Sequence, residues 1–427
     1  MSFLTELNDT IRGDTETYGT TASRFMQPTG FTCFDYLNGE IAYNGKNERL
    51  VHVGVDHGKI ITVIGKSGSG KSTFAMQMGA QLIKPFKEGA IFVFDFEQGS
   101  SKERIKQITG MDEDYYNEHV TLLQKGISTE SVLKLIMQIK KLKLEHEKEL
   151  LVDNPNGEKD ENGEVIKVLP PTVVVIDSIA SMLPANELDE DIIKGQMTAT
   201  GIAKVNTQLF KRIGMPCATA NIIPIFINHI NAKIETTIVP TQSQVNYLSQ
   251  SETLPGGNAC IYLTNTLIRI TTKSKLEPDK GYQIKGFETA VSLVKSRSSA
   301  AGRSVTMVYN QFEGFDNDLS LLEYIKACGK LKGAGVSYKL EGLEDHTFRL
   351  SAFKDKLKED TVLRNHFYKL GKELLEASIY ESAKLKKMQD EEAESQKIDE
   401  NIEAEKMAQT DIEVSEALET LSEPEQE

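Results

Sequence analysis

Eight consecutive residues combine glycines, a lysine and a hydroxyl in an order that suits phosphate binding. Residues 65–72 read Gly-Lys-Ser-Gly-Ser-Gly-Lys-Ser, between a run that predicts a strand and a run that predicts a helix. Glycines let backbone amides face phosphate oxygens, and the amino end of the helix adds positive potential. We therefore expect Lys71 to reach the terminal phosphates of a nucleotide and the Ser72 hydroxyl to bind magnesium. Cofactor contacts are expected from Gly65, Lys66, Ser67, Gly68, Ser69, Gly70, Lys71, Ser72 and Thr73.

Two acidic residues at the ends of apolar runs could complete such a site. Asp177 closes a run at 172–178, where a buried strand would present its carboxylate as a second magnesium ligand. Glu97 closes a run at 90–97 and could orient or deprotonate the attacking water. Asp95 could serve instead, which would leave Glu97 as a surface charge. These residues predict hydrolysis of a nucleoside triphosphate.

The elements that must position these residues alternate between strands and helices. Runs rich in Val, Ile and Phe predict strands covered on both faces, at residues 59–65, 90–97, 172–178, 223–230, 265–271, 289–295 and 304–310. Apolar residues recurring every three or four positions predict helices at residues 71–84, about 129–149 and 198–213. We expect an α/β fold whose mostly parallel sheet is covered by helices on both faces. Residues 150–170 contain two Asn-Gly pairs and many charges, so an inserted hairpin or loop is expected there.

The composition is that of an ordinary globular protein. A chain of 427 residues, 39% hydrophobic and 26% charged, can form a large core domain with smaller flanking domains. No apolar run approaches the ~20 residues that cross a bilayer, and the first residues do not resemble a signal peptide. A soluble cytoplasmic protein with no membrane partner is expected. Four widely spaced cysteines indicate neither a zinc site nor disulfides and are expected to be small buried residues: Cys33, Cys217, Cys260 and Cys328.

The acidic charge is concentrated at one end of the chain. The net charge is −14, but Asp390 to Glu427 hold 15 acidic residues and 2 lysines, a net of −13, which leaves −1 for residues 1–389. Overall charge therefore neither supports nor excludes a DNA partner, because a local groove decides phosphate contact.

Beyond the phosphate-binding loop, several motifs resemble those of RecA-like recombinases. The pair Asp95-Phe-Glu97 is similar to the family's Asp-x-Glu, whose glutamate activates water. Residues 173–184 resemble its second acidic strand, and residues 225–234 resemble the next strand, which ends in a polar residue that senses the γ-phosphate. Here that residue is His229, and a histidine resembles the branch found in large tailed bacteriophages. A histidine at a strand end can also be purely structural.

The resemblance implies two DNA-binding segments and the cofactors ATP and Mg²⁺. The first falls at residues 186–199, where Met197 could wedge between bases or could instead belong to the core. The second is the polar segment 231–254, which precedes a Gly-Gly-Asn-Ala sequence as in the family. A disordered surface loop is the alternative for this segment, although loops of that length are uncommon in compact domains unless they are functional. DNA contacts are expected from Lys194, Gly195, Gln196, Met197, Lys204, Lys233, Gly256, Gly257 and Asn258.

Two basic residues end the strand expected at 289–295. Residues two apart on a strand point to the same face, which groups Lys295 with Arg297. The resemblance implies that they reach the ATP of a neighbouring subunit, as arginine fingers do. The alternative is that both are simply solvated.

The likeness covers residues 25–315, where 28–41 resemble the family's entry to the core, and it departs in three places. Residues 150–170 have no counterpart in the family. The adenine-stacking tyrosine is replaced near Arg104 or Ile105, and Arg104 could stack on a purine instead. The C-terminal region shares only a general helical and acidic character.

Four domains are expected on this basis. Residues 1–28 form an N-terminal oligomerisation segment and residues 29–318 a RecA-like ATPase core. Strands are expected to stop near residue 318, so that 319–389 form a small, mainly helical domain. Residues 390–427 are expected to be an acidic, largely disordered tail that competes with DNA, recruits a basic loading factor or only solubilises the protein.

The implied function is DNA-dependent ATP hydrolysis by a homo-oligomeric helical filament on single-stranded DNA. ATP would hold the high-affinity state, and the filament would pair with duplex DNA and exchange strands in recombination, repair and replication. A single-strand-binding protein and a loading mediator are implied partners. The alternatives are a hexameric replicative helicase with the same core, and a scaffold that binds ATP without meaningful turnover.

Overall fold

The computed structural model describes residues 25–43, 49–160, 163–188, 199–232, 252–276, 286–334 and 337–379. Several predicted features therefore lie outside the described residues: most of the N-terminal segment, the acidic tail, Lys194, Gly195, Gln196, Met197 and Lys233. The chain divides into two units, Met1–Glu376 and Ala377–Glu427, and the site lies in the first.

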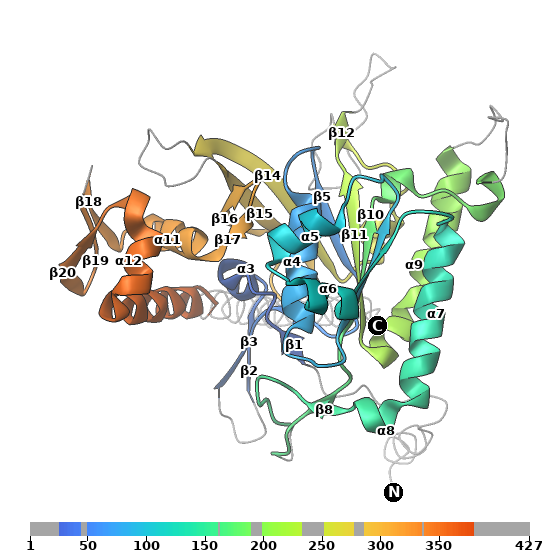
Figure 1. Cartoon of the computed structure of the whole chain (residues 1–427), viewed down its shortest axis with the longest axis horizontal. Coiled ribbons are helices and arrows are strands. Elements are labelled where there is room, and N and C mark those ends of the chain that lie inside the picture. The colour runs from blue at the N-terminus through green and yellow to red at the C-terminus, as the bar shows by residue number, and fades with distance from the viewer. Residues whose placement is uncertain are drawn as a thin grey trace, which may run out of the picture. The chain divides into compact units, whose positions relative to one another are not determined.

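The first unit is built on a nine-stranded mixed sheet with strand order β17-β16-β15-β14-β5-β11-β10-β6-β7 (Figure 1). The six strands from β14 to β7 are parallel, whereas β15, β16 and β17 continue the sheet with antiparallel pairing. The strands are β5 Ile61–Gly65, β6 Ala90–Asp95, β7 Val120–Leu123, β10 Thr172–Asp177, β11 Ile222–His229, β14 Thr266–Leu276, β15 Gly286–Ser296, β16 Arg303–Asn310 and β17 Gly314–Asp316. All seven strand predictions are confirmed, and two short edge strands, β7 and β17, are added to them.

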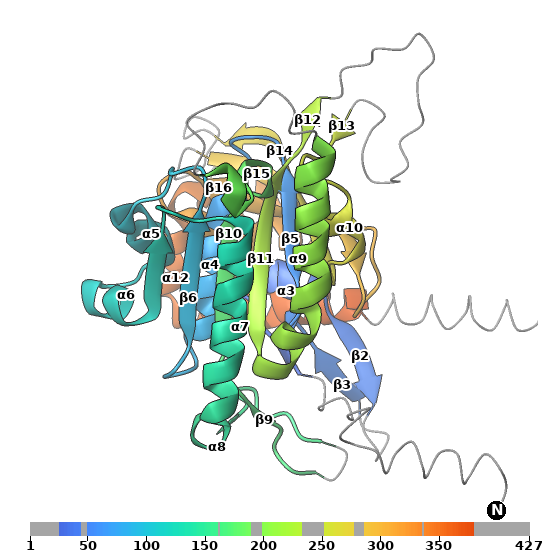
Figure 2. The same ribbon diagram turned by 90° about the vertical axis from the view of Figure 1, so that its right-hand side faces the viewer.

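Helices cover both faces of this sheet, as the sequence predicted. Figure 2 shows α7 and α9 side by side over one face, while α4 lies on the other. The helices are α3 Thr32–Leu37, α4 Lys71–Ile83, α5 Lys102–Thr109, α6 Glu113–His119, α7 Thr129–Glu145, α8 Glu147–Leu150, α9 Ala199–Ala220, α10 Ala259–Tyr262, α11 Asn317–Ala327, α12 Phe353–Glu359 and a helix over residues 361–379. Short 3-10 turns span Ile179–Ser181, Ala185–Glu187 and Leu350–Ala352.

Alternating side chains of the central strands divide the apolar interior into two layers. In β10, Val173 and Val175 belong to the layer beneath α4, whereas Val174 and Ile176 belong to the layer beneath α7 and α9. This follows from the two-residue period of a strand, and it explains why the central runs are continuously apolar.

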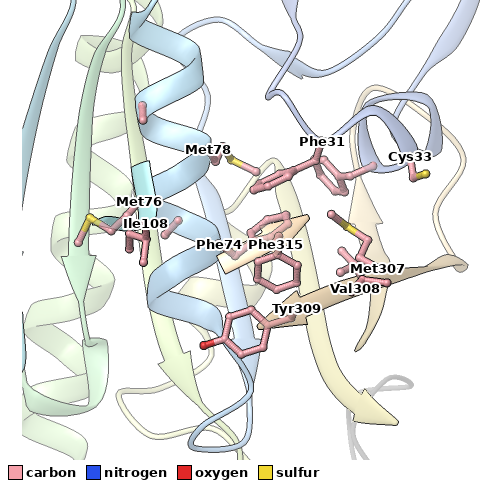
Figure 3. Packing of buried hydrophobic residues seen from close by; sticks show 14 of the residues in the cluster. Phe31, Cys33, Phe74, Met76, Met78, Ile108, Met307, Val308, Tyr309 and Phe315 are labelled. Atoms are coloured by element: carbon pink, nitrogen blue, oxygen red, sulfur yellow. The ribbon is translucent and has the colours of Figure 1, made fainter. Parts of the chain in front are cut away.

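The layer beneath α4 fixes the helix that follows the phosphate-binding loop. The Phe74 ring stacks on Phe31 with centroids 4.6 Å apart and meets Phe315 edge-on at 5.3 Å. Figure 3 shows this aromatic group between α4, α3 and the outer strands. Fully burying such a side chain contributes about 1.5–3 kcal/mol, so these contacts hold the first turns of α4 firmly in place.

The helix α9 is longer than the sequence predicted. It was expected to end at residue 213, but it continues through Pro216 to Ala220. Cys217 and Ala220 are fully buried against the sheet in this extension. Tertiary packing therefore outweighs the hydrogen bond that a proline removes from a helix.

The expectation that strands stop near residue 318 is wrong. Three short strands, β18 Leu331–Ala334, β19 Ser337–Leu340 and β20 Leu343–Phe348, form an antiparallel sheet beside the C-terminal helices. Of the apolar side chains described in these strands, only Leu340 and Phe348 are fully buried. Strands that face water on one side carry many charges, so these segments lack the continuous apolar run by which the other strands were predicted.

Residues 150–170 form a hairpin in the described part, with β8 Val152–Asp153 paired to β9 Lys167–Val168. Further two-stranded pairs join β1 Met26–Gln27 to β4 Val55–Asp56, and β2 Glu40–Tyr43 to β3 Arg49–His52. The cysteine prediction is confirmed for three residues but is wrong for Cys328, which is exposed where α11 ends. Among the described helices, none has the length and apolar character needed to span a membrane.

Candidate nucleotide site

The predicted site residues meet where neighbouring parallel strands end. In the sheet register Gly65 of β5 lies beside His229 of β11 on one side and Ile270 of β14 on the other. Asp177, the last residue of β10, lies beside Asp95, the last residue of β6. Ligands of open α/β sheets bind outside the carboxyl ends of the strands, which is the edge that these residues share.

The loop between β5 and α4 is shaped to receive a polar ligand. Gly70 has a φ of 90°, and a Cβ there would lie 3.2 Å from the Tyr309 ring and 3.3 Å from the Phe315 ring. The Ser69 hydroxyl is buried and has no hydrogen-bond partner among the described residues. A buried hydroxyl without a partner fits a loop whose polar groups are completed by phosphate oxygens. Of the other residues expected to contact the cofactor, Lys66, Ser67 and Gly68 are exposed in the loop. Thr73 is buried in α4.

The Lys71 ammonium is held inside this loop. Its Nζ donates a hydrogen bond to the Lys66 carbonyl at 2.8 Å, and the side chain is buried. Burial lowers the pKa of Lys71, while the nearby carboxylates of Asp177 and Glu97 oppose that shift. The loop therefore places a cation next to the two acidic residues of the site.

Ser72 and Asp177 form the pair of oxygen ligands that magnesium would need. The Ser72 hydroxyl donates to Asp177 Oδ2 at 2.5 Å. Burial raises the pKa of Asp177 to about 6, although the Ser72 hydrogen bond opposes the rise. Hydroxyl and carboxylate oxygens are ligands that Mg²⁺ prefers, so this pair fits the ion.

Glu97 lies just beyond the end of β6, between a serine and a histidine. The Ser178 hydroxyl donates to Glu97 Oε1 at 2.5 Å, and His229 Nε2 lies 2.8 Å from the same oxygen. Burial favours the neutral carboxyl, but the Ser178 and His229 hydrogen bonds and nearby positive charge outweigh it, so the pKa of Glu97 is lowered. Its side chain remains 38% exposed, which leaves an ionised carboxylate accessible to water.

Ser178 is a residue of this site that the sequence pattern did not indicate. It directly follows Asp177, so its position next to an acidic strand end was the available signal. Its role depends on the side-by-side order of β10 and β6, which the sequence does not reveal.

Asp95 has a different environment from Glu97. Its buried carboxylate accepts hydrogen bonds from the backbone amides of Gly99 at 3.3 Å and Ser100 at 2.8 Å, and from Gln124 Nε2 at 2.8 Å. These contacts fold the turn after β6 back onto the strand end. The geometry therefore favours Glu97 over Asp95 as the group that contacts water.

Comparison with known proteins also points to an ATPase. Residues 127–315 match the family model of the RecA N-terminal domain, and residues 41–201 match the KaiC model of ATPases. RecA proteins of the Streptococcus pneumoniae strains Hungary19A-6, CGSP14 and G54 are 24% identical to this chain over 290 residues. The alignment covers 67% of the chain and 62% of each relative. The chain has a RecA-like P-loop ATPase fold.

Arg104, which was expected near the nucleotide base, lies in the first turn of α5. Its Nη1 donates to the Phe312 carbonyl at 3.3 Å and to Gln107 Oε1 at 3.1 Å. Phe312 lies in the turn between β16 and β17, and its side chain is 70% exposed. The structure thus places a planar cation and an exposed aromatic residue close together, and the sequence pattern indicated only the cation.

Lys295 and Arg297 lie where the parallel strands begin, whereas the P-loop lies where they end. Ser296 pairs with Thr266, which pairs with Ile61 at the start of β5, roughly 13 Å along the strand from Gly65. Lys295 Nζ donates to the carbonyls of Ile261 at 2.9 Å and Tyr262 at 2.7 Å, and Arg297 Nη2 donates to Tyr262 at 3.3 Å. Both cations therefore cap the end of α10 and are not brought together with the P-loop of their own chain.

The described residues expected to bind DNA occupy two kinds of position. Lys204 is exposed on α9 and Asn258 is exposed before α10. Gly256 and Gly257 pack closely against their neighbours: a Cβ would lie 2.5 Å from Ile179 Cγ2 at the first and 2.8 Å from Ala203 Cβ at the second. Both have positive φ, 79° and 87°, which favours glycine.

Proposed function

We propose that this chain is a DNA-dependent ATPase and recombinase, which forms a filament on single-stranded DNA and exchanges strands with a homologous duplex. The observation that carries the proposal is the position of His229. Its Nε2 lies 2.8 Å from Glu97 Oε1, and the polar segment that resembles a DNA-binding loop begins two residues later at Asn231. A change at the γ-phosphate would therefore reach that segment through a very short length of chain.

Hydrolysis would divide among side chains at the carboxyl edge of the sheet. The magnesium and nucleotide that such a loop binds supply an electrophilic phosphorus and the charge that polarises it. Ser72 and Asp177 would hold the ion, and Lys71 would contact the terminal phosphates. Glu97, kept ionised by Ser178 and His229, would orient the attacking water and accept its proton at a carboxylate oxygen.

Lys295 and Arg297 would act on the nucleotide of a neighbouring copy. Their place at the far edge of the sheet argues against contact with the P-loop of their own chain. In a head-to-tail assembly, the amino ends of the parallel strands in one copy face the carboxyl ends of the strands in the next. Two neighbouring copies would then share each triphosphate. Positive charge supplied from a neighbour stabilises charge on a transferring phosphoryl group.

The finer parts of the proposal concern the nucleotide base, the partners and the source. Arg104 would stack on adenine through its guanidinium plane. The histidine at position 229 favours the branch of large tailed bacteriophages. A single-strand-binding protein and a loading mediator would assist assembly in recombination, repair and replication, and the acidic tail would modulate access of DNA.

Strand exchange between circular single-stranded DNA and a linear homologous duplex tests this proposal. We expect joint molecules with the wild-type protein, ATP and homologous DNA, and none with Lys71→Ala or with a heterologous duplex. Unwinding without homology by closed rings would instead indicate a hexameric helicase. DNA-stimulated phosphate release no greater than that of Lys71→Ala would indicate a non-catalytic scaffold.

A further inference from the structure

Arg269 and Glu252 form a two-point ion pair that the nucleotide site does not use. Arg269 Nη1 lies 3.0 Å from Glu252 Oε2, and Nη2 lies 2.9 Å from Oε1. The two side chains are only 23% and 11% exposed. Such two-point pairs between an arginine and a carboxylate fix orientation as well as contributing energy, and they are stronger where water is partly excluded.

The pair joins the end of the polar segment to the strand beside the P-loop. Glu252 belongs to β13 Glu252–Thr253, the first described element after residue 251, while Arg269 lies on β14. The next residue on β14, Ile270, pairs with Gly65. A Cβ on Gly65 would lie 2.5 Å from the Ile270 carbonyl oxygen, so the two backbones are in close contact at this point.

The start of the polar segment is tied to the same glycine. The Ile230 amide donates to the Gly65 carbonyl at 3.0 Å, one residue after His229. The chain then enters β12 Asn231–Ala232, which pairs with β13 so that Ala232 lies opposite Glu252. The entry of the segment is thus bonded to Gly65, and its exit is linked to the strand that pairs with Gly65.

The β12–β13 pairing alone cannot hold the second of these ends. Each strand has two residues, and isolated two-stranded ribbons are marginal in water. The Arg269 guanidinium adds two charge-assisted hydrogen bonds between β13 and β14. They act beside the burial of Leu254 and the hydrogen bond from Asn228 Nδ2 to the Pro255 carbonyl at 2.9 Å. Loss of this pair would remove the two-point link between β13 and β14 and loosen the exit of the segment, but leave Lys71, Ser72, Glu97 and Asp177 in place.

We propose that Arg269 and Glu252 are positioning residues that set how strongly DNA stimulates ATP hydrolysis. The pair keeps the exit of the polar segment in register with its entry, next to His229. DNA bound by the segment then acts on a strand end that is fixed relative to Glu97. This inference rests on the proposed function, since it assumes that the segment binds DNA.

Single and paired substitutions in the full-length protein test this role. We expect Arg269→Gln and Glu252→Gln each to lower the DNA-stimulated kcat by about tenfold while the DNA-free rate stays within about twofold of wild type. The charge-exchanged double variant Arg269→Glu with Glu252→Arg should recover most of the stimulation. Arg269→Lys should recover only part of it, because an ammonium cannot make the two-point contact.

A control is provided by an ion pair between α12 and β17. Lys354 Nζ lies 2.7 Å from Asp316 Oδ2, at side-chain exposures of 28% and 6%. Lys354→Gln removes a partly buried pair remote from the polar segment, so it should leave the DNA stimulation unchanged. Thermal unfolding midpoints of all variants show how much stability each loses.

Four results would overturn the inference. Equal losses of DNA-free and DNA-stimulated rates would show a merely structural pair, as would an unchanged stimulation ratio in Arg269→Gln. A charge-exchanged variant no better than the single variants would show that the two residues do not act together. Absence of DNA stimulation in the wild-type protein would overturn the proposed function as well, which separates the two failures.

Discussion

Glu97 and Asp95 show how two carboxylates two residues apart come to lie in different environments. Asp95 is fully buried and receives three hydrogen bonds from the turn that follows it and from Gln124. Glu97 is partly exposed and contacts side chains from β11 and from the residue after β10. Both residue types and their spacing could be read from the sequence, but the choice between them could not, because it depends on Gln124 and Ser178 from distant parts of the chain.

This difference leads to the first prediction. Glu97→Gln should retain nucleotide binding and lower the ATPase kcat by about 10²- to 10⁴-fold, since the amide cannot accept a proton from water. Single-turnover hydrolysis and nucleotide titration separate the two effects. Asp95→Asn, the matched control, should mainly lower the unfolding midpoint, and a larger loss of kcat in Asp95→Asn than in Glu97→Gln would reverse the assignment.

Lys143 is a buried cation with a structural role. Its Nζ donates to three backbone carbonyls, at 2.5 Å to Pro170, 3.1 Å to Ala220 and 3.3 Å to Asn221. It thereby ties the end of the 150–170 hairpin to the end of α9. Burial lowers the pKa of Lys143 to about 7, with a smaller opposing effect from Cys217.

The second prediction concerns the pH dependence of stability. Between pH 7 and about 10 the unfolded chain keeps its proton on Lys143 while the folded chain loses it, so stability increases with pH over this window. Wild type should therefore gain stability relative to Lys143→Met as pH rises, on the order of a few kcal/mol. The nearby His57 and Cys217 stay uncharged there, because burial lowers the pKa of His57 to about 3 and raises that of Cys217 to about 12.

The measurement is the difference in thermal unfolding midpoint between wild type and Lys143→Met across that range. Lys141→Met is the control, because Lys141 lies on the same helix with its side chain 77% exposed. The difference for Lys141→Met should not vary with pH. A flat difference for Lys143→Met would contradict the lowered pKa.

At the scale of elements, the sequence predicts the strands and helices that are determined by a local pattern of residues. The continuous apolar runs and the glycine-rich turn identified the seven long strands and the helix α4 that position Lys71, Asp177 and Glu97. The helices α5 and α6 and the strands β18 to β20 were missed, because short elements with many charged residues lack a clear hydrophobic period. The two-point pair between Arg269 and Glu252 was also missed, since it depends on strand register.

Gly256 supports the third prediction, on the connection between β13 and α10. Its φ of 79° and its closeness to Ile179 both exclude a side chain. Gly302 has a similar φ of 86°, but a Cβ there would have nothing within 4 Å, so this position isolates the backbone cost. Gly256→Ala should lower the free energy of unfolding by about 1–3 kcal/mol more than Gly302→Ala.

Urea unfolding of the two alanine variants measures this difference. Both variants pay the free-energy cost of a side chain at positive φ, so this cost cancels in the difference. What remains is the cost of the steric contact with Ile179. Equal destabilisation would mean that the Gly-Gly turn is free to move away from the 3-10 turn at Ile179–Ser181.

At the scale of the whole molecule, the sheet separates the two halves of the proposed catalytic site. The P-loop, Asp177 and Glu97 lie at one edge, whereas Lys295 and Arg297 lie at the other and cap α10. The sequence indicated both groups of residues, but only the register shows that one chain cannot bring them together. A complete site would therefore require two copies.

Mixing two inactive variants tests this claim most directly. Lys71→Ala lacks the phosphate-contacting lysine, and Lys295→Ala with Arg297→Ala lacks the proposed fingers, so each should show little DNA-stimulated ATPase alone. In an equimolar co-assembly, about a quarter of the interfaces would join an intact P-loop to intact fingers, and about a quarter of wild-type activity should return. If tagged and untagged copies are shown to co-assemble and no activity returns, or if the finger variant alone hydrolyses ATP at the wild-type rate, the shared site is contradicted.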